Sequence, residues 1–255
     1  MFLFDAIIYK PIYNLLIFVY SVVPFRDFGV AIILVTIVIK LLLIPLSKKQ
    51  IESQKKMQEL QPKIKELQAK HKNDKEKQSR ALMDLYKEKK TNPFSGCLPM
   101  IVQLVFLIAI YRVLFNISEA GLKVNIADLY AFVPDPGQIH HMFLGIIDLA
   151  SVLNLGSLTF ANVPQIILVI MAAGSQYIQT KMLMGKQVAA PAGKDADFSQ
   201  MMSKQMLYLG PLLTLFIGIK FPAGLALYWL VSTVFMIAQQ YYLEKKELPE
   251  AKKVN

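Results

Sequence analysis

The chain has 255 residues, of which 55% are hydrophobic and only 18% charged. A soluble domain carries about 45–50% apolar and about 25% charged residues, so this composition excludes an ordinary soluble globular protein and indicates a membrane protein. The net charge of +10 then indicates how the chain is oriented in the bilayer, and the single cysteine excludes an intrachain disulfide framework.

Residues 1–26 predict an amphipathic helix that lies in the outer membrane interface. Its apolar face is formed by five residues: Ile8, Ile12, Leu15, Leu16 and Val19. Lys10 and Asn14 make a sixth membrane span the less favoured alternative. The segment lacks the basic start and the small-residue cleavage site of a secretory signal, so we expect it to be retained.

Five segments are predicted to span the membrane, because a span needs about 20 mostly apolar residues. They are 27–46, 94–115, 160–182, 205–220 and 221–243. The fourth segment is short and contains Gly210-Pro211, so we expect an interrupted helix and a locally thinned bilayer. The outer loop 116–159 includes an apolar stretch with Asp148, which we place at the outer surface because a lone carboxylate within the bilayer is costly.

The orientation follows from the distribution of Lys and Arg. The segments 47–93, 183–204 and 244–255 contain fourteen, three and four of the 28 Lys and Arg residues. Only five lie in the outer segments or at the outer helix ends. Cytoplasmic segments collect basic residues, so we expect the N-terminus outside and the C-terminus in the cytoplasm.

Residues 47–93 predict a charged helical hairpin in the cytoplasm. The apolar stripes of its two helices consist of Met57, Leu60, Ile64 and Leu67, followed by Leu82, Leu85 and Tyr86. Glu-to-Lys pairs four residues apart support the first helix, in which Pro62 is expected to cause a kink or an interruption. Within 183–204, an Ala-Ala-Pro-Ala-Gly sequence predicts a flexible linker.

Lys40 is the strongest indication of function, because it lies inside a strongly apolar span. Intramembrane cations usually face a partner or a water-filled cavity. The alternative is a side chain that extends to the inner surface, about 10 Å away. Gln103 and Ser232 also lie within predicted spans. Such polar residues either hold helices together or, with Lys40, line one hydrated cavity.

The sequence indicates no enzyme. His140 and His141 are adjacent and therefore share no helical face for a metal, and His71 is the only other histidine. Neither a Ser/His/Asp arrangement nor a glycine-rich phosphate loop is present. We therefore expect no catalytic residues, no metal and no cofactor.

Three motifs occur in a specific order along the chain. They are Leu60-Gln61-Pro62-Lys63-Ile64, then Asn92-Pro93-Phe94-Ser95-Gly96-Cys97-Leu98-Pro99 with Gln103, then Phe221-Pro222-Ala223-Gly224-Leu225-Ala226-Leu227-Tyr228-Trp229 with Ser232. In this order and spacing they resemble the YidC-type membrane protein insertases, which have mitochondrial and thylakoid relatives. The resemblance covers roughly residues 5–244.

The resemblance implies an all-α polytopic protein of the bacterial plasma membrane with a five-helix core, a cytoplasmic helical hairpin and an N-terminal interfacial helix. It also implies a positively charged groove that is open to the cytoplasm and to lipid. Lys40 matches the groove cation of the family, which is usually arginine. By the same matching, the groove residues would include Thr36, Gln103, Tyr228, Trp229 and Ser232.

The implied function is that of an insertase or chaperone that releases transmembrane segments into the bilayer without nucleotide hydrolysis. The implied partners are nascent membrane proteins, the ribosome, the Sec translocon and lipid, with no specific nucleic acid apart from the ribosome. We expect a monomer.

Two other functions remain open. The first is a small-anion secondary transporter or channel in which Lys40 binds the anion, although the odd number of spans and the lack of repeats argue against it. The second is a membrane scaffold whose hairpin, with a net charge of +7, binds the ribosome or anionic lipid.

Overall fold

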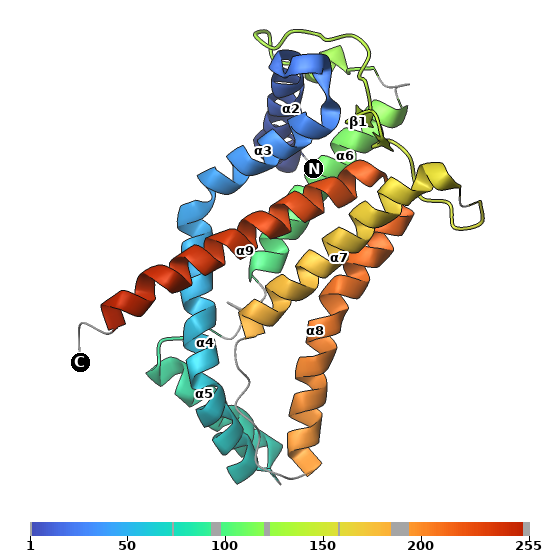
Figure 1. The fold of residues 1–255 in the computed structure, drawn as a ribbon. Helices are drawn as coiled ribbons and strands as arrows, with labels where there is room; N and C mark the ends of the chain where they lie inside the picture. Colours follow the sequence, from blue (N-terminus) through green and yellow to red (C-terminus); the bar gives the residue numbers. More distant parts are fainter. Residues whose placement is uncertain are drawn as a thin grey trace.

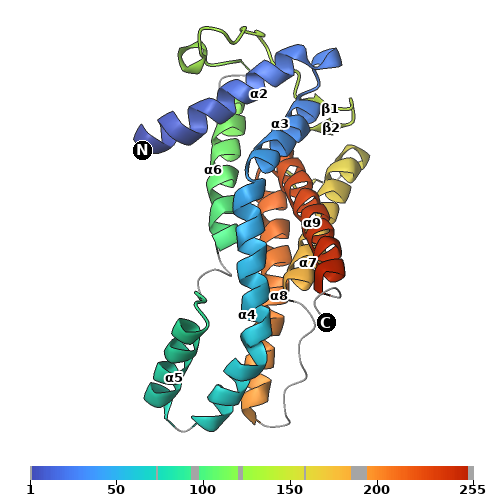
Figure 2. The same ribbon diagram turned by 90° about the vertical axis from the view of Figure 1, so that its left-hand side faces the viewer.

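The structure is a computed structural model that describes residues 2–72, 74–92, 98–119, 123–157, 159–184 and 194–251. Helices dominate these residues and form an elongated molecule (Figures 1 and 2). In chain order the elements are α1 (Phe2–Phe4), the π-helix η1 (Asp5–Tyr9), α2 (Lys10–Val22), η2 (Pro24–Arg26), α3 (Phe28–Leu42), α4 (Ile44–Lys70), α5 (Lys75–Glu88), α6 (Leu98–Glu119), η4 (Ile126–Asp128), β1 (Met142–Phe143), β2 (Ile147–Asp148), η5 (Phe160–Asn162), α7 (Val163–Met184), α8 (Lys194–Lys220) and α9 (Ala223–Ala251).

The body of the molecule is formed by α3, α6, α7, α8 and α9. Helix α9 packs along both α3 and α7, and α7 packs along α8 (Figure 1). Ile32 of α3, Ile110 of α6 and Leu225 of α9 belong to one buried apolar core. Gly218 lets α7 and α8 approach closely, since a Cβ atom there would lie 2.8 Å from Val169 Cγ1. Small residues at helix contacts are typical of membrane proteins.

Two helical segments among the described residues are long and apolar enough to cross a membrane, Phe160–Leu183 and Ala223–Leu243. A third candidate is α3 together with α4, a pair bent by 66°. Ile101–Ile117 and Leu207–Lys220 are shorter apolar helices. This composition is that of a multi-pass membrane protein.

The predicted span 27–46 is not one continuous helix. Helix α3 ends at Leu42, and α4 begins at Ile44 with a different direction. Pro45 explains the break, because proline lacks an N–H and its ring clashes with the carbonyl four residues earlier. In the first turn of the new helix the same residue is well tolerated.

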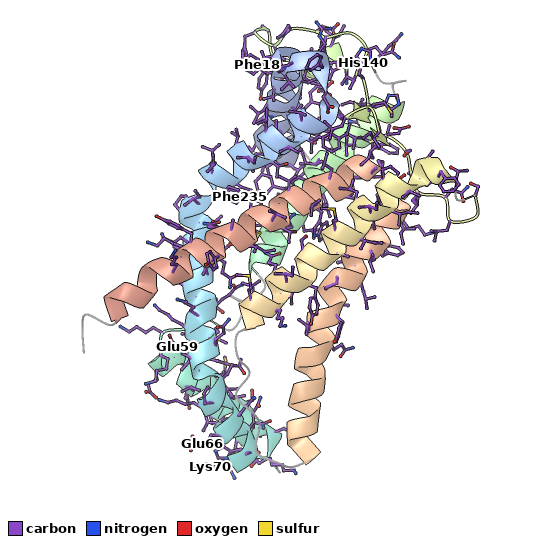
Figure 3. All side chains as sticks on the ribbon, viewed as in Figure 1. Phe18, Glu59, Glu66, Lys70, His140 and Phe235 are labelled. Carbon is purple, nitrogen blue, oxygen red and sulfur yellow. The ribbon has the colours of Figure 1, made fainter. Side chains whose placement is uncertain are left out.

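Helix α4 then continues through Pro62 to Lys70, so of the two effects predicted for Pro62 the interruption is wrong, and the kink stays a prediction. Leu60 and Ile64, on either side of this proline, are both buried against α5 in a cluster with Leu85. This packing on both sides stabilises the helical path. Glu59, Glu66 and Lys70 lie at this end of the molecule, and Phe18 and His140 lie at the opposite end (Figure 3).

Helix α8 is longer than predicted and is not interrupted at Gly210-Pro211. It begins at Lys194, so residues 194–204 are helical, and the prediction of a loop over 183–204 is wrong for this part. Proline is tolerated within membrane helices when neighbouring helices and Ser or Thr side chains satisfy the freed backbone groups. Thr214 Oγ1 donates to the Gly210 carbonyl at 3.0 Å, one turn after the Leu207 carbonyl that Pro211 leaves without its N–H donor. The remaining linker residues 185–193 and residues 93–97 of the second motif lie outside the described residues.

Helix α2 covers one end of the bundle (Figure 2). Its buried face differs from the predicted aliphatic face, because three of the five predicted residues (Ile8, Leu15 and Val19) are only half-buried. The other two, Ile12 and Leu16, are buried, and they are joined by Tyr13, Ile17 and Tyr20, which were not predicted. Tyrosine contributes here because its ring fills the interface while its hydroxyl reaches polar backbone at the edge.

Polar contacts fix α2 and the preceding π-helix η1 in place. Arg112 of α6 forms an ion pair with Asp5, and its guanidinium carbon lies 4.7 Å from the centre of the Tyr9 ring. The Tyr13 hydroxyl accepts a hydrogen bond from the Asn125 N–H at 2.8 Å. Burial raises the pKa of Tyr13 to about 12, so this hydroxyl stays protonated at neutral pH.

The segment 123–157 forms a cap over the start of α9. Strands β1 and β2 pair antiparallel, with Phe143 opposite Ile147. The Ala223 N–H donates to the Ser151 carbonyl and the Gly224 N–H donates to the Leu149 carbonyl, both at 2.9 Å. The cap thereby satisfies two of the N–H groups that a helix leaves free at its N-terminus.

Candidate functional site

Lys40 lies in the last turn of α3 and is half-buried between α6 and α9. Its Nζ donates to Gln103 Oε1 at 3.0 Å and lies 3.4 Å from Met236 Sδ. Among the described residues, no carboxylate forms a salt bridge with Lys40. Both contact atoms are neutral, so no residue that the structure describes compensates the positive charge. Such a charge is costly within a bilayer and indicates a functional site.

Gln103 of α6 connects Lys40 to α9. Its Oε1 accepts a second hydrogen bond from Ser232 Oγ at 2.9 Å, which occupies both lone pairs of that oxygen. Its Nε2 is buried without a hydrogen-bond partner. A buried donor that lacks a partner costs about 1–3 kcal/mol. The cluster therefore has more donors than acceptors, which suits a bound carboxylate or carbonyl oxygen.

Helix α9 contributes several residues at intervals of four. Ser232 is fully buried, and Tyr228, one turn earlier and also buried, lies close to both Ser232 and Gln103. Met236 follows one turn later against Lys40. Sequence reasoning missed Met236, although residues 228, 232 and 236 share one helical face and that spacing was available as a signal.

The structure brings together four of the six predicted site residues, and two point elsewhere. Thr36 lies one turn before Lys40, is buried, and donates to the carbonyl of Ile32 in its own helix at 2.6 Å. Trp229 donates from Nε1 to Gln176 Oε1 on α7 at 2.9 Å. Thr36 therefore satisfies its hydroxyl within α3, and Trp229 connects α9 to α7.

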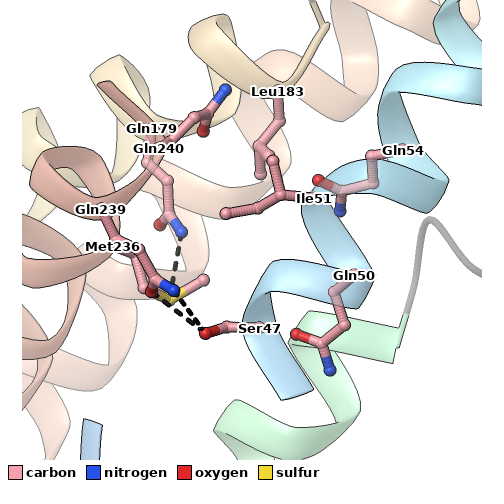
Figure 4. A pocket seen from close by; sticks show the side chains of 9 residues that line it. All are labelled: Ser47, Gln50, Ile51, Gln54, Gln179, Leu183, Met236, Gln239 and Gln240. Atoms are coloured by element: carbon pink, nitrogen blue, oxygen red, sulfur yellow. Dashed lines mark hydrogen bonds between the residues drawn. The ribbon is translucent and has the colours of Figure 1, made fainter. Parts of the chain in front are cut away.

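A second polar cluster lies where α4 meets α7 and α9 (Figure 4). Its members are Ser47, Gln50, Ile51 and Gln54 of α4, Gln179 and Leu183 of α7, and Met236, Gln239 and Gln240 of α9. Gln239 Nε2 donates to Ser47 Oγ at 2.7 Å, and Gln179 Nε2 lies 3.3 Å from Met236 Sδ. Met236 thus contacts both this cluster and Lys40. Sequence reasoning did not find the α4 residues of this cluster.

The two clusters differ in their chemistry. The Lys40 cluster carries one positive charge and an unpaired amide donor. The second cluster consists of neutral side chains, most of them amides. No group of three or more His, Cys, Asp or Glu residues within the described ranges could hold a metal ion.

A family model described as 60Kd inner membrane protein matches residues 18–251. The chain is 36% identical over 239 residues to the membrane protein insertase YidC of Geotalea uraniireducens, covering 92% of this chain and 37% of that protein. It is 36% identical over 237 residues to the membrane protein insertase YidC of Magnetococcus marinus, a match that covers 93% of this chain and 35% of that protein. The membrane protein insertase YidC of Rickettsia rickettsii is 35% identical over 246 residues, a match that covers 94% of this chain and 39% of that protein. The chain thus spans less than two fifths of the length of these relatives.

A crystal structure described as an active YidC insertase with its first transmembrane domain resolved superposes with a TM-score of 0.57 at 24% identity. The match covers 94% of this chain and 46% of that chain, so the two share a fold. The family model spans most of the chain, from residue 18 to residue 251. The chain therefore belongs to the 60Kd inner membrane protein family.

Proposed function

We propose that this chain is a membrane protein insertase that receives polar segments of nascent membrane proteins at Lys40 and releases their apolar segments into the bilayer. The observation that carries the proposal is the uncompensated Lys40 charge next to the unpaired Nε2 of Gln103. Together they present a cation and a donor to an incoming carboxylate. The names of the relatives, which are membrane protein insertases, support the same function.

In this proposal α3, α6, α7, α8 and α9 form a five-helix membrane core, and the α4–α5 hairpin lies in the cytoplasm. The N-terminus is outside and the C-terminus is inside, because fourteen Lys and Arg residues lie in segment 47–93. Lys40 then lies near the cytoplasmic end of α3, where a substrate arriving from that side would meet it. Thr36, Tyr228, Trp229 and Ser232 line or support the path.

The physical problem for an insertase is the cost of moving a polar tail through hydrocarbon. Each unsatisfied polar group there costs several kcal/mol. A polar site that reaches partway across shortens the dry part of the path, and Lys40 attracts acidic residues more strongly there than in water. Burial of the apolar substrate segment in lipid supplies the driving force, so no nucleotide is consumed. The partners proposed are nascent chains, the ribosome and the Sec translocon.

Site-specific photocrosslinking tests this proposal. A photoreactive residue replaces Gln103 or Met236 during synthesis of a single-span protein with an acidic N-terminal tail. Leu34 and Val38 of α3 serve as controls, because both are exposed on the outer surface of the bundle. We expect crosslinks to the nascent chain at Gln103 and Met236 but not at the controls. Absence of crosslinks at every position, with the protein folded, would contradict the proposal and favour the transporter.

A further inference from the structure

Helix α4 carries a neutral face that contrasts with its charged surroundings. Ser47, Gln50, Gln54 and Gln58 fall within an arc of about 80° on a helix with 3.6 residues per turn. The charged side chains of the same stretch, such as Glu52 and Lys56, are exposed on the opposite side. We call the four neutral residues the amide track.

The amide track contains polar groups that the protein itself does not satisfy. Gln50 Nε2 and Gln54 Oε1 are buried without hydrogen-bond partners, and their residues are only 6% and 8% exposed. These two residues line the pocket shared with α7 and α9 (Figure 4). A buried donor and a buried acceptor without partners destabilise the closed arrangement and leave both atoms available to pair with an incoming group.

One member of the track already binds a main-chain group. Gln58 Nε2 donates to the backbone carbonyl of Leu183, near the end of α7. A carboxamide carries both donors and an acceptor, so it can pair with the C=O and the N–H of a peptide unit. Rotation of the carboxamide by about 180° exchanges its oxygen and its NH₂ group. The same glutamine can therefore bind either the C=O or the N–H of a peptide unit.

The spacing of the track also fits an extended polypeptide. Residues four apart on a helix are about 6 Å apart along its axis. Peptide groups that face the same side of an extended chain recur about every 6.8 Å, which is two residues at about 3.4 Å each. Gln50, Gln54 and Gln58 would therefore meet successive same-facing peptide groups of a chain that runs along α4.

We propose that the amide track binds the main chain of an extended substrate segment on its way from the cytoplasm to Lys40. This inference rests on the proposed insertase function and adds the part of the substrate that is recognised there. Main-chain amides are common to all polypeptides, so such a track accepts substrates of any side-chain charge. Lys40 then discriminates by charge, and Met236 lies between the two steps because it contacts both clusters.

Substrate binding at the track requires α4 to move. The enclosed space in the pocket is about 10 Å³, which is room for about one water molecule and no peptide. The break between α3 and α4 supplies a hinge, because Leu43 has non-helical dihedral angles of φ −89° and ψ 1° and the two helices are bent by 66°. Rotation there would separate Gln50 and Gln54 from α7 and α9 and expose both amides to an incoming chain.

The first experiment replaces the unpaired amides by leucine, as Gln50→Leu, Gln54→Leu and the double variant. The insertion rate is measured for two single-span substrates. Their tails are identical except that one carries acidic residues where the other carries neutral ones. We expect the double variant to slow insertion at least about fivefold for both tails, since each lost hydrogen bond counts separately. Stability to unfolding should stay unchanged or rise, because leucine removes an unsatisfied buried group. Lys56→Gln on the exposed face is the matched control and should insert normally.

Other outcomes would overturn the amide track. Normal insertion by the double variant would overturn it. A reduced insertion rate for acidic tails alone would also overturn it. Reduced stability in parallel with reduced insertion would reveal a merely structural role. A photoreactive residue at position 54, 56 or 103 separates this inference from the proposed function. We expect crosslinks to the nascent chain at 54 and 103 but not at 56. Crosslinks at position 103 alone would overturn the amide track and leave the proposed insertase function standing. Absence of crosslinks at both 54 and 103 would overturn both proposals.

Discussion

Replacement of Lys40 by methionine should slow the insertion of acidic tails far more than that of neutral tails. Methionine keeps much of the side-chain length and removes the charge. A substrate carboxylate about 3 Å from Nζ would gain about 5–6 kcal/mol of Coulomb energy at an effective dielectric constant of about 20. Desolvation offsets much of this gain, and a net value of about 1.5–3 kcal/mol is typical of a hydrogen bond to a charged group. The acidic tail should therefore insert about 10- to 150-fold more slowly.

The assay uses purified protein in liposomes and two single-span substrates whose tails carry either Asp or Asn at the same positions. Protection of the tail from external protease reports insertion. Lys40→Arg keeps the charge and should stay within about threefold of the original protein for both tails. The neutral tail should lose less than about threefold in the Lys40→Met variant, because it carries no charge for Lys40 to attract. An equal loss for both tails would refute the electrostatic reasoning, and so would no loss for the acidic one.

Two predictions concern the helix contacts around the site. Trp229→Phe removes the donor to Gln176 Oε1 and should lower the free energy of unfolding by about 1 kcal/mol, measured by reversible unfolding in bicelles. Gly218→Ala places a Cβ atom 2.8 Å from Val169 Cγ1 and should cost about 1–3 kcal/mol by the same measurement. Gly174→Ala is its matched control, because nothing lies within 4 Å of a Cβ atom there, and it should leave stability unchanged or slightly higher.

The predictions from local sequence succeeded where a helix is determined by its own residues. All five apolar segments are helical over most of their described residues, although the first is broken at Leu43 and the helix of the fifth begins only at Ala223. The predictions failed where contacts with neighbouring helices decide whether a helix continues or breaks. Pro45 breaks a helix and Pro62 does not, although both were visible in the sequence, because Pro62 has buried leucine and isoleucine contacts on either side and Pro45 lies at a change of direction.

The candidate site shows the same limit in another form. Periodicity identifies residues that share a face, such as Tyr228, Ser232 and Met236, but it does not say which face meets which helix. Lys40 and Met236 are separated by 196 positions in the chain. Their contact depends on the packing of α3 against α9, which no local pattern encodes. The neutral face of α4 could likewise be recognised from the spacing of its residues. Its burial, however, depends on contacts with α7 and α9.

The absence of a carboxylate next to Lys40, within the part of the chain that the structure describes, is itself a requirement of the proposed function. An internal partner would convert substrate binding into an exchange of one ion pair for another, with little net gain. Gln103 fixes the Lys40 side chain through a neutral oxygen at 3.0 Å and leaves the charge available. Gln103→Glu tests this reasoning, because it keeps the side-chain size and places a carboxylate at that distance. The variant should be at least as stable as the original protein, since an ion pair replaces a hydrogen bond between the charged Lys40 donor and a neutral acceptor. Its insertion of acidic tails should nevertheless fall to the level of Lys40→Met, while neutral tails insert normally. If Gln103→Glu inserted acidic tails at the original rate, the charge of Lys40 would have no part in receiving the substrate.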